Sequence, residues 1–242
     1  MGSVCLVRDT LLSGRPVALK FLKPDRILSG GIDEFKDEFR AMARLRHPNL
    51  AEVYDFGTSD ADGRHFLTME FVDGDDLERL PRADLRARFD SLAVQCLRAL
   101  DYIHSRGILH NDIKPQNIMV RPPFQVKLLD FGLASPQAES TQYSLSGTIH
   151  YIAPERLEGK QVDGRSDLYS LGVILYDVLT GALPHTGSHA GQVVTSILRG
   201  RTRRPHSTPS ARRGRHPKGT RPPTPGGRGC CGGGQAAPHP DA

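Results

Sequence analysis

The stretch HNDIKPQN, residues 110–117, decides how the rest of this chain is interpreted. It places an acid, a cation and an amide at positions 112, 114 and 117, too close in sequence for one helix or strand to present all three together. Pro115 has no N–H and fixes its own φ, so the segment is predicted to be a shaped loop. Apolar residues flank it on both sides, within 102–109 and at 118–120. Polar loops held between buried elements are where catalytic groups tend to lie.

Charge is divided unevenly along the 242 residues. The net charge of +5 comes from the segment after residue 198, which holds ten Lys or Arg and one acid, so residues 1–198 carry a net −4. The hydrophobic fraction of 38% and the charged fraction of 24% are ordinary for a soluble globular protein. A mildly acidic folded part argues against nucleic acid as its main partner.

Four cysteines occur, at 5, 96, 230 and 231, with no C-x-x-C pair and no histidine at metal-binding spacing. This pattern indicates neither a disulfide framework nor a zinc site, and it favours a reducing compartment. The longest apolar run, near residues 171–179, contains Asp177 and is too short to span a bilayer. We therefore expect a cytoplasmic protein that has no membrane partner.

The N-terminal part is predicted to be a small antiparallel sheet with one helix. Strand-like runs occur at 4–7, 16–22, 50–56 and 64–72, and residues 32–45 repeat apolar side chains at helical spacing. After residue 73 the pattern becomes mainly helical, with apolar stripes over 84–105 and 167–180 and a shorter helix at 189–198. A hairpin at 118–120 and 126–129 follows the opening loop. The predicted fold class is α+β and bilobal.

Residues 199–242 contain no Val, Ile, Leu, Met, Phe or Tyr, and 17 of these 44 residues are Gly or Pro. Such a segment buries too little apolar surface to offset the entropy of ordering the chain. We predict two parts, a folded domain over residues 1–198 and a disordered Gly/Pro/Arg-rich tail over residues 199–242.

Four motifs, in this order, resemble those of protein kinase domains. VALK at 17–20 is similar to the family's V-A-I-K strand, HNDIKPQN to H-R-D-x-x-x-x-N, and DFG at 130–132 to D-F-G. APE at 153–155 is the fourth. The resemblance is to bacterial-type serine/threonine kinases and covers residues 1–198. It is incomplete at both ends, because the family's first strand and last helices have no counterpart.

The resemblance implies that ATP binds between the two lobes. Lys20 would contact the α/β-phosphates and would be held in place by an ion pair with Glu38. Gly2 would belong to the family's glycine-rich loop over the phosphates. Because only the last part of that loop is present, we expect ATP to bind weakly.

The adenine site is also implied by the resemblance. Met69 would be the gatekeeper, and the hinge from Glu70 to Val72 would hydrogen-bond the base. Val4 and Ala18 would cover it.

The opening loop would then be the catalytic loop. Asp112 would accept the proton of the substrate hydroxyl, while Asn117 and Asp130 would hold Mg²⁺. Lys114, two residues after the acid, is typical of serine/threonine rather than tyrosine kinases and is counted among the catalytic residues. Phosphoryl transfer is catalysed mainly by positioning and charge neutralisation, which explains why it needs cations against phosphate and carboxylates against Mg²⁺. Asp167 resembles the residue that braces this loop.

Asn111 departs from the family pattern, which commonly has an Arg that contacts a phosphate on the activation segment. Ser144, Ser146 and Thr148 are candidate phosphosites. With Asn at position 111, we expect activity to depend little on their phosphorylation.

The predicted function is ATP- and Mg²⁺-dependent phosphorylation of Ser or Thr hydroxyls on protein substrates. One alternative is a scaffold that keeps the kinase shape without catalysis, and another is an inactive fragment, because the resemblance is cut at both ends. A third is nucleic-acid binding through the basic cluster at 201–204. Retention of every chemical residue favours catalysis.

Overall fold

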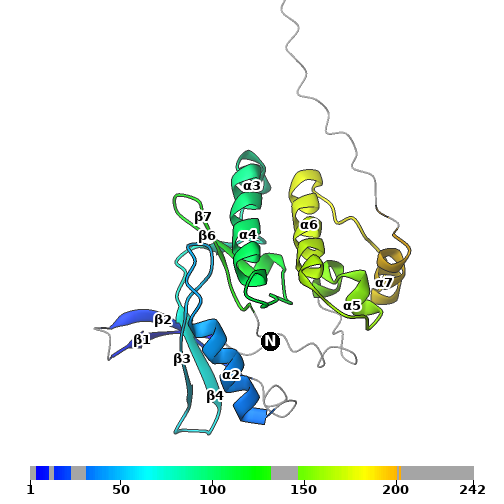
Figure 1. The fold of residues 1–242 in the computed structure, drawn as a ribbon. Helices are drawn as coiled ribbons and strands as arrows, with labels where there is room; N and C mark the ends of the chain where they lie inside the picture. The colour runs from blue at the N-terminus through cyan, green and yellow to red at the C-terminus, as the bar shows by residue number, and fades with distance from the viewer. Residues whose placement is uncertain (1–3, 11–13, 23–30, 132–146, 201, 203–242) are drawn as a thin grey trace, which may run out of the picture. The chain divides into compact units, whose positions relative to one another are not determined.

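The structure is a computed structural model, and it describes residues 4–10, 14–22, 31–131, 147–200 and 202. The predicted tail lies almost entirely outside the described residues. The folded part contains an antiparallel sheet with one helix against it, followed by a mainly helical region (Figure 1). The α+β class predicted from the sequence is confirmed.

The first sheet holds four strands in the order β1-β2-β4-β3, all antiparallel. They are β1 (Val4–Asp9), β2 (Arg15–Phe21), β3 (Val53–Thr58) and β4 (His65–Glu70). Helix α2 (Gly31–Ala43) packs beside β3 (Figure 1). Phe35 of this helix meets the ring of Phe56 at 5.1 Å, and Phe39 meets the same ring at 5.9 Å. Aromatic contacts of this kind explain why the helix stays on the sheet.

Strand β2 lies inside the sheet and carries the VALK motif. Ala18 lies opposite Leu6 on one side and Met69 on the other, and Lys20 lies opposite Val4 and Leu67. Because side chains alternate along a strand, Ala18 and Lys20 share one face, as the sequence predicts.

A second, three-stranded sheet has the order β5-β6-β7 and consists of β5 (Asp75–Asp76), β6 (Ile118–Arg121) and β7 (Gln125–Leu128). The segment after α2 runs beside β7, where Leu128 N–H donates to Asn49 O and Ala51 N–H donates to Leu128 O, both at 2.9 Å. Part of the run predicted as a strand over 50–56 therefore joins the second sheet, by a bridge at Leu50, before β3 begins at Val53.

The helix predicted over 84–105 is two helices, α3 (Arg82–Ala87) and α4 (Phe89–His104), separated by Arg88 with φ −120° and ψ 24°. Side chains of α3 bind α6, because Arg82 and Arg86 donate to the carbonyl oxygens of Asp177 and Val178, both at 2.8 Å. Helix α4 also packs against α6, and in addition against β7. The chain bends between the two helices at Arg88.

Helix α6 (Gly164–Thr180) begins three residues before the predicted start, because the side chain of Asp163 caps it by accepting from Arg165 N–H at 2.9 Å. It ends at Gly181, whose φ of 78° is the left-handed conformation common after helices. The remaining helices are α5 (Pro154–Leu157) and α7 (Ala190–Leu198), with short 3₁₀ turns η1 (Pro115–Asn117) and η2 (Gly147–Tyr151).

One large apolar cluster runs from the first sheet through the helical region. Met42, Leu67 and Met69 belong to it, as do Leu92 and Leu171, all nearly inaccessible to solvent. A smaller cluster lies between η2 and α7 and contains Ile149, Ile152, Val193 and Ile197. The predicted catalytic loop lies between α4 and β6, both of which contribute to the large cluster.

Candidate active site

The loop at 110–117 is held at its first two residues by the side chain of Asp167 from α6. This buried carboxylate accepts the N–H of His110 at 2.8 Å, the N–H of Asn111 at 2.9 Å and Nε2 of His104 at 2.8 Å. Burial alone would raise the pKa of Asp167, but these hydrogen bonds and the nearby His110 hold it below the ordinary value. Asp167 thus occupies the bracing position that the sequence predicts.

The polar residues of the loop converge on Asp112. Lys114 Nζ lies 2.6 Å from Asp112 Oδ2, and Asn117 Nδ2 donates to the same oxygen at 2.8 Å. Asn117 Nδ2 also donates to the backbone oxygen of Asp112 at 2.8 Å. Lys114 and Asn117 are buried, whereas the Asp112 side chain is 26% exposed. The loop therefore presents one partly exposed carboxylate held by two buried partners.

His110 begins the loop and is fully buried, with its ring against Phe131 at 6.5 Å. Its Nε2 has no hydrogen-bond partner among the described residues. Burial lowers the pKa of His110 below 6.5, although the carboxylates of Asp167, Asp112 and Asp130 act to raise it. The imidazole is therefore neutral at neutral pH, and its Nδ1 accepts the N–H of Asp112 at 3.3 Å.

Lys20 and Asp130 come together across the two sheets. Lys20 Nζ lies 2.6 Å from Asp130 Oδ2, and both side chains are largely buried, at 16% and 18% exposure. The predicted partner of this lysine, Glu38, is at an exposed position on α2. The ammonium of Lys20 thus has a carboxylate at ion-pair distance, and the ion pair with Glu38 stays a prediction.

The two residues predicted to hold Mg²⁺ are tied together through the backbone, because Leu129 N–H, next to Asp130, donates to Asn117 O at 2.9 Å. Hard cations such as Mg²⁺ prefer oxygen ligands and are often held by one or two protein side chains. Asp130 supplies a carboxylate, and no hydrogen bond among the described residues uses Asn117 Oδ1. These residues fit a magnesium ion. In the described part of the chain, no group of three or more His, Cys, Asp or Glu side chains is arranged to hold a metal.

The predicted adenine site lies along β2 and the end of β4. Met69 and Val72 are buried, at 6% and 4% exposure, and Phe71 is 37% exposed. Ala18 is partly buried against the large apolar cluster, and Val4 is 58% exposed on β1. Gly2 lies outside the described residues. Ala18 and Met69, both predicted to lie at the adenine site, are direct neighbours across β2 and β4.

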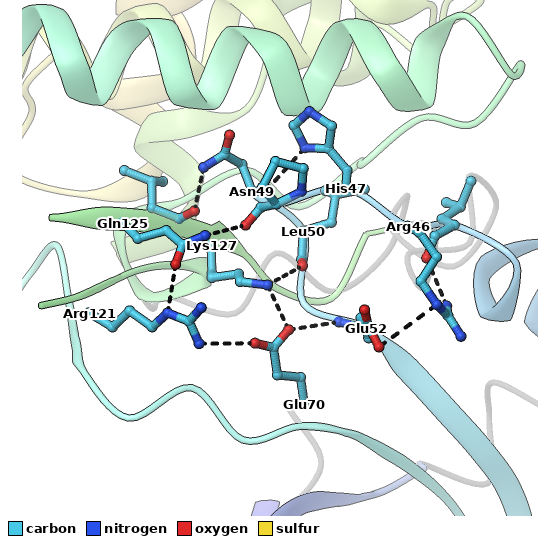
Figure 2. Close-up of polar contacts among 12 residues, drawn as sticks. Arg46, His47, Asn49, Leu50, Glu52, Glu70, Arg121, Gln125 and Lys127 are labelled. Atoms are coloured by element: carbon cyan, nitrogen blue, oxygen red, sulfur yellow. Dashed lines mark hydrogen bonds and ion pairs between the residues drawn. The ribbon is translucent and has the colours of Figure 1, made fainter. Parts of the chain in front are cut away.

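Figure 2 shows a polar network around Glu70, the first residue of the predicted hinge, and the sequence did not predict this network. Glu70 Oε2 lies 2.8 Å from Nζ of the buried Lys127, which also donates to Leu50 O at 3.0 Å. Arg121 Nη1 lies 3.4 Å from Glu70 Oε1 (Figure 2). The one available signal was a lysine inside the apolar run of β7.

Segment 147–157 lies next to the catalytic loop. Tyr151, its last 3₁₀ residue, has its carbonyl bound by Ser170 Oγ at 2.6 Å. Burial raises the pKa of the Tyr151 hydroxyl to about 12, with a further contribution from the carboxylates of Asp177 and Glu78. Glu155 accepts a hydrogen bond from Ser166 Oγ. Of the candidate phosphosites, Ser144 and Ser146 and the side chain of Thr148 lie outside the described part.

An unpredicted contact completes the site, because Arg156 Nη1 donates to the carbonyl oxygen of Asn111. The segment that follows the D-F-G motif therefore touches the catalytic loop directly.

A loop that presents Asp112, a lysine opposite Asp130 and an ordered A-P-E segment define the class of protein kinases. The family described as "Protein kinase domain" matches residues 1–217, which is most of the chain. This chain belongs to the protein kinase family.

Its relatives include bacterial proteins named as serine/threonine kinases. A probable serine/threonine-protein kinase PknB of Lactococcus lactis is 36% identical over 200 residues, covering 78% of this chain and 31% of that protein. A probable serine/threonine-protein kinase of Streptomyces coelicolor is 40% identical over 198 residues, covering 77% of this chain and 29% of the relative. The serine/threonine-protein kinase PknA of Mycobacterium tuberculosis is 40% identical over 201 residues, covering 78% of this chain and 46% of that protein. The chain spans less than half the length of these relatives. Among the helices of the described residues, none has the length and apolar character needed to cross a membrane.

Proposed function

We propose that this protein transfers the γ-phosphate of ATP to Ser or Thr hydroxyls of protein substrates, with Mg²⁺ as cofactor. The observation that carries the proposal is the arrangement around Asp112. Both buried partners, Lys114 and Asn117, bind its Oδ2, at 2.6 and 2.8 Å. No hydrogen bond among the described residues uses Oδ1, so this oxygen is left to accept the proton of an incoming hydroxyl.

Two other residues complete the proposed chemistry. Lys20 reaches the neighbourhood of Asp130, where its ammonium would lie against ATP phosphates. Asn117 and Asp130 would hold Mg²⁺, which supplies neutralisation of charge on the transferring phosphate. Since phosphoryl transfer depends on positioning and charge, the tight bracing of the loop by Asp167 supports the proposal.

A transfer assay tests this function. The purified chain is incubated with Mg²⁺, γ-labelled ATP and a serine- and threonine-rich protein, and the labelled amino acids are identified. We expect phosphoserine or phosphothreonine, lost on chelation of Mg²⁺ and lowered by about 100-fold or more in Asp112→Asn and Asp130→Asn. Asp101→Asn, at an exposed position of α4, is the matched control. Phosphotyrosine, or equal activity in all variants, would contradict the proposal.

A second candidate is a scaffold that binds nucleotide without transferring phosphate. The observation in its favour is that Lys20 pairs with Asp130, the proposed metal ligand, at 2.6 Å. In that case ATP and Mg²⁺ would raise the melting temperature of the protein, and the transfer assay would detect no labelled product.

We also infer a cytoplasmic setting, in which thiols stay reduced. Cys5 and Cys96 are both free, and Cys96 is fully buried. Nucleic-acid binding would require the basic tail, which lies outside the described part of the chain, and is not proposed.

A further inference from the structure

Asn111 has an unusual backbone conformation directly before Asp112. Its φ of 64° lies in the left-handed region, which few residues adopt and in which Asn is among the better tolerated. Such a conformation persists when surrounding contacts hold it, and it is found often at functional sites. The identity of those contacts therefore matters for the proposed catalytic base.

Two side chains hold Asn111 from opposite ends of the residue. Its N–H donates to Asp167 Oδ1 at 2.9 Å. Its carbonyl oxygen accepts from Arg156 Nη1. That carbonyl belongs to the peptide group that also contains the N–H of Asp112. Arg156 therefore binds the peptide group that joins Asn111 to Asp112.

Arg156 comes from a firmly held segment. Helix α5 follows the fully buried Ala153, and the neighbouring Glu155 is bound by Ser166 Oγ of α6. Arg156 is itself partly buried. A guanidinium held by this segment can fix the orientation of a peptide group, because its planar N–H donors have a set geometry.

We propose that Arg156 is a positioning residue that orients the Asn111–Asp112 peptide, and with it the Asp112 carboxylate, for phosphoryl transfer. This inference rests on the proposed function. It also assigns a specific role to Arg156 of α5, which follows the A-P-E motif. Arg156 does not touch the reacting atoms. Its effect is exerted through the peptide that precedes Asp112.

Three variants of the full chain, with a fourth in reserve, test the proposal. Arg156→Met keeps the length of the side chain and removes the donor, whereas Arg156→Lys keeps one donor. Arg165→Met is the matched control, because Arg165 is an exposed arginine on α6 that binds only Asp163 among the described residues. Arg156→Gln provides a second donor-changing variant if Arg156→Met does not fold.

We expect kcat to fall by about 10-fold or more in Arg156→Met, while KM for ATP changes by less than about 2-fold. Arg156→Lys should retain kcat within about 3-fold. A role in folding alone would lower the melting temperature without this split between kcat and KM. Unchanged kcat in Arg156→Met, or a change equal to that of Arg165→Met, would overturn the proposal.

Amide hydrogen exchange of the peptide that contains residues 110–114 gives a readout independent of catalysis. We expect faster exchange there in Arg156→Met than in the wild type and in Arg165→Met. If the wild type transfers no phosphate, the proposed function fails, and this exchange measurement still tests the contact. Equal exchange in all three proteins would reject the positioning role.

Discussion

Lys127 Nζ lies 2.8 Å from Glu70 Oε2 and 3.0 Å from the carbonyl oxygen of Leu50. Lys127 belongs to β7 of the second sheet, and Glu70 ends β4 of the first. Their side chains are only 7% and 13% exposed. A buried ion pair thus joins the end of β4 to the hairpin formed by β6 and β7.

Replacing Lys127 by Met is expected to destabilise the fold by about 3 kcal/mol, because Glu70 would be left charged and buried without its main partner. Urea unfolding at neutral pH measures the change. The double variant Lys127→Met with Glu70→Gln should recover a large part of the loss, because no uncompensated charge remains. Arg121→Met serves as the control and should cost less than about 1 kcal/mol, since Arg121 is 38% exposed and 3.4 Å from the carboxylate. A loss in Lys127→Met no larger than in Arg121→Met would refute this account of the hinge.

Acid should weaken the fold through His110. Because burial lowers its pKa below 6.5, the unfolded chain binds a proton at a pH where the folded chain does not. The contribution of His110 to the free energy of unfolding is therefore largest above about pH 6.5. It declines as the pH falls below that value, by at most about 1.4 kcal/mol per pH unit. Denaturant unfolding at about pH 7.5 and about pH 5.5 measures the slope.

His110→Phe tests this effect, since a phenyl ring can still pack against Phe131 and cannot be protonated. The variant also loses the Nδ1 that accepts the Asp112 N–H, so the pH slope, and not the stability at one pH, is the quantity to compare. Its unfolding free energy should depend less on pH than that of the wild type over the same interval. Equal slopes in the two proteins would show that His110 is not responsible.

Asp167→Asn should lower both stability and turnover. An amide keeps a single acceptor oxygen, whereas Asp167 uses both oxygens for the N–H groups of His110 and Asn111 and for His104. A buried donor left without a partner costs about 1–3 kcal/mol. Urea unfolding and kcat are the measurements. Asp163→Asn is the control, because Asn caps a helix as well as Asp does. A comparable loss of stability and kcat in Asp163→Asn would argue against the bracing role of Asp167.

Cys96 should resist alkylation in the folded protein. It is fully buried in the large apolar cluster, and burial raises the pKa of its thiol to about 12, so almost no reactive thiolate exists at neutral pH. Cys5 is exposed and should react readily. Peptide mapping after a brief treatment with iodoacetamide, with and without denaturant, distinguishes the two. Labelling of Cys96 at the rate of Cys5 under native conditions would contradict the predicted burial.

The sequence predicts the elements well where local pattern and tertiary contact agree. The VALK strand and the loop at 110–117 occur where expected, because hydrophobic periodicity and Pro115 act locally. The break at Arg88 could not be predicted, since the apolar stripe continues through it and the bend depends on the binding of α3 to α6.

The site was only partly predictable for a similar reason. Asp112, Lys114 and Asn117 meet because they share one loop, so their sequence spacing carries the information. The contact of Lys20 with Asp130 joins β2 to the residue two positions after β7, so it depends on how distant segments lie in space and not on sequence spacing. Arg156 carries no sequence signal as a partner of the loop, because its contact spans 45 residues.

The left-handed backbone recurs at Asp130, whose φ is 60°, close to the 64° of Asn111. Only Gly, Asn and Asp enter this region at low cost. A library randomised at both positions and selected for phosphate transfer should therefore retain a narrow set at 111, with Gly and Asp alongside Asn and β-branched residues excluded. At position 130 the proposed role of the carboxylate as a Mg²⁺ ligand would exclude Gly and Asn as well, so the selection should return Asp alone there. A position without an acceptable replacement cannot change by neutral substitution.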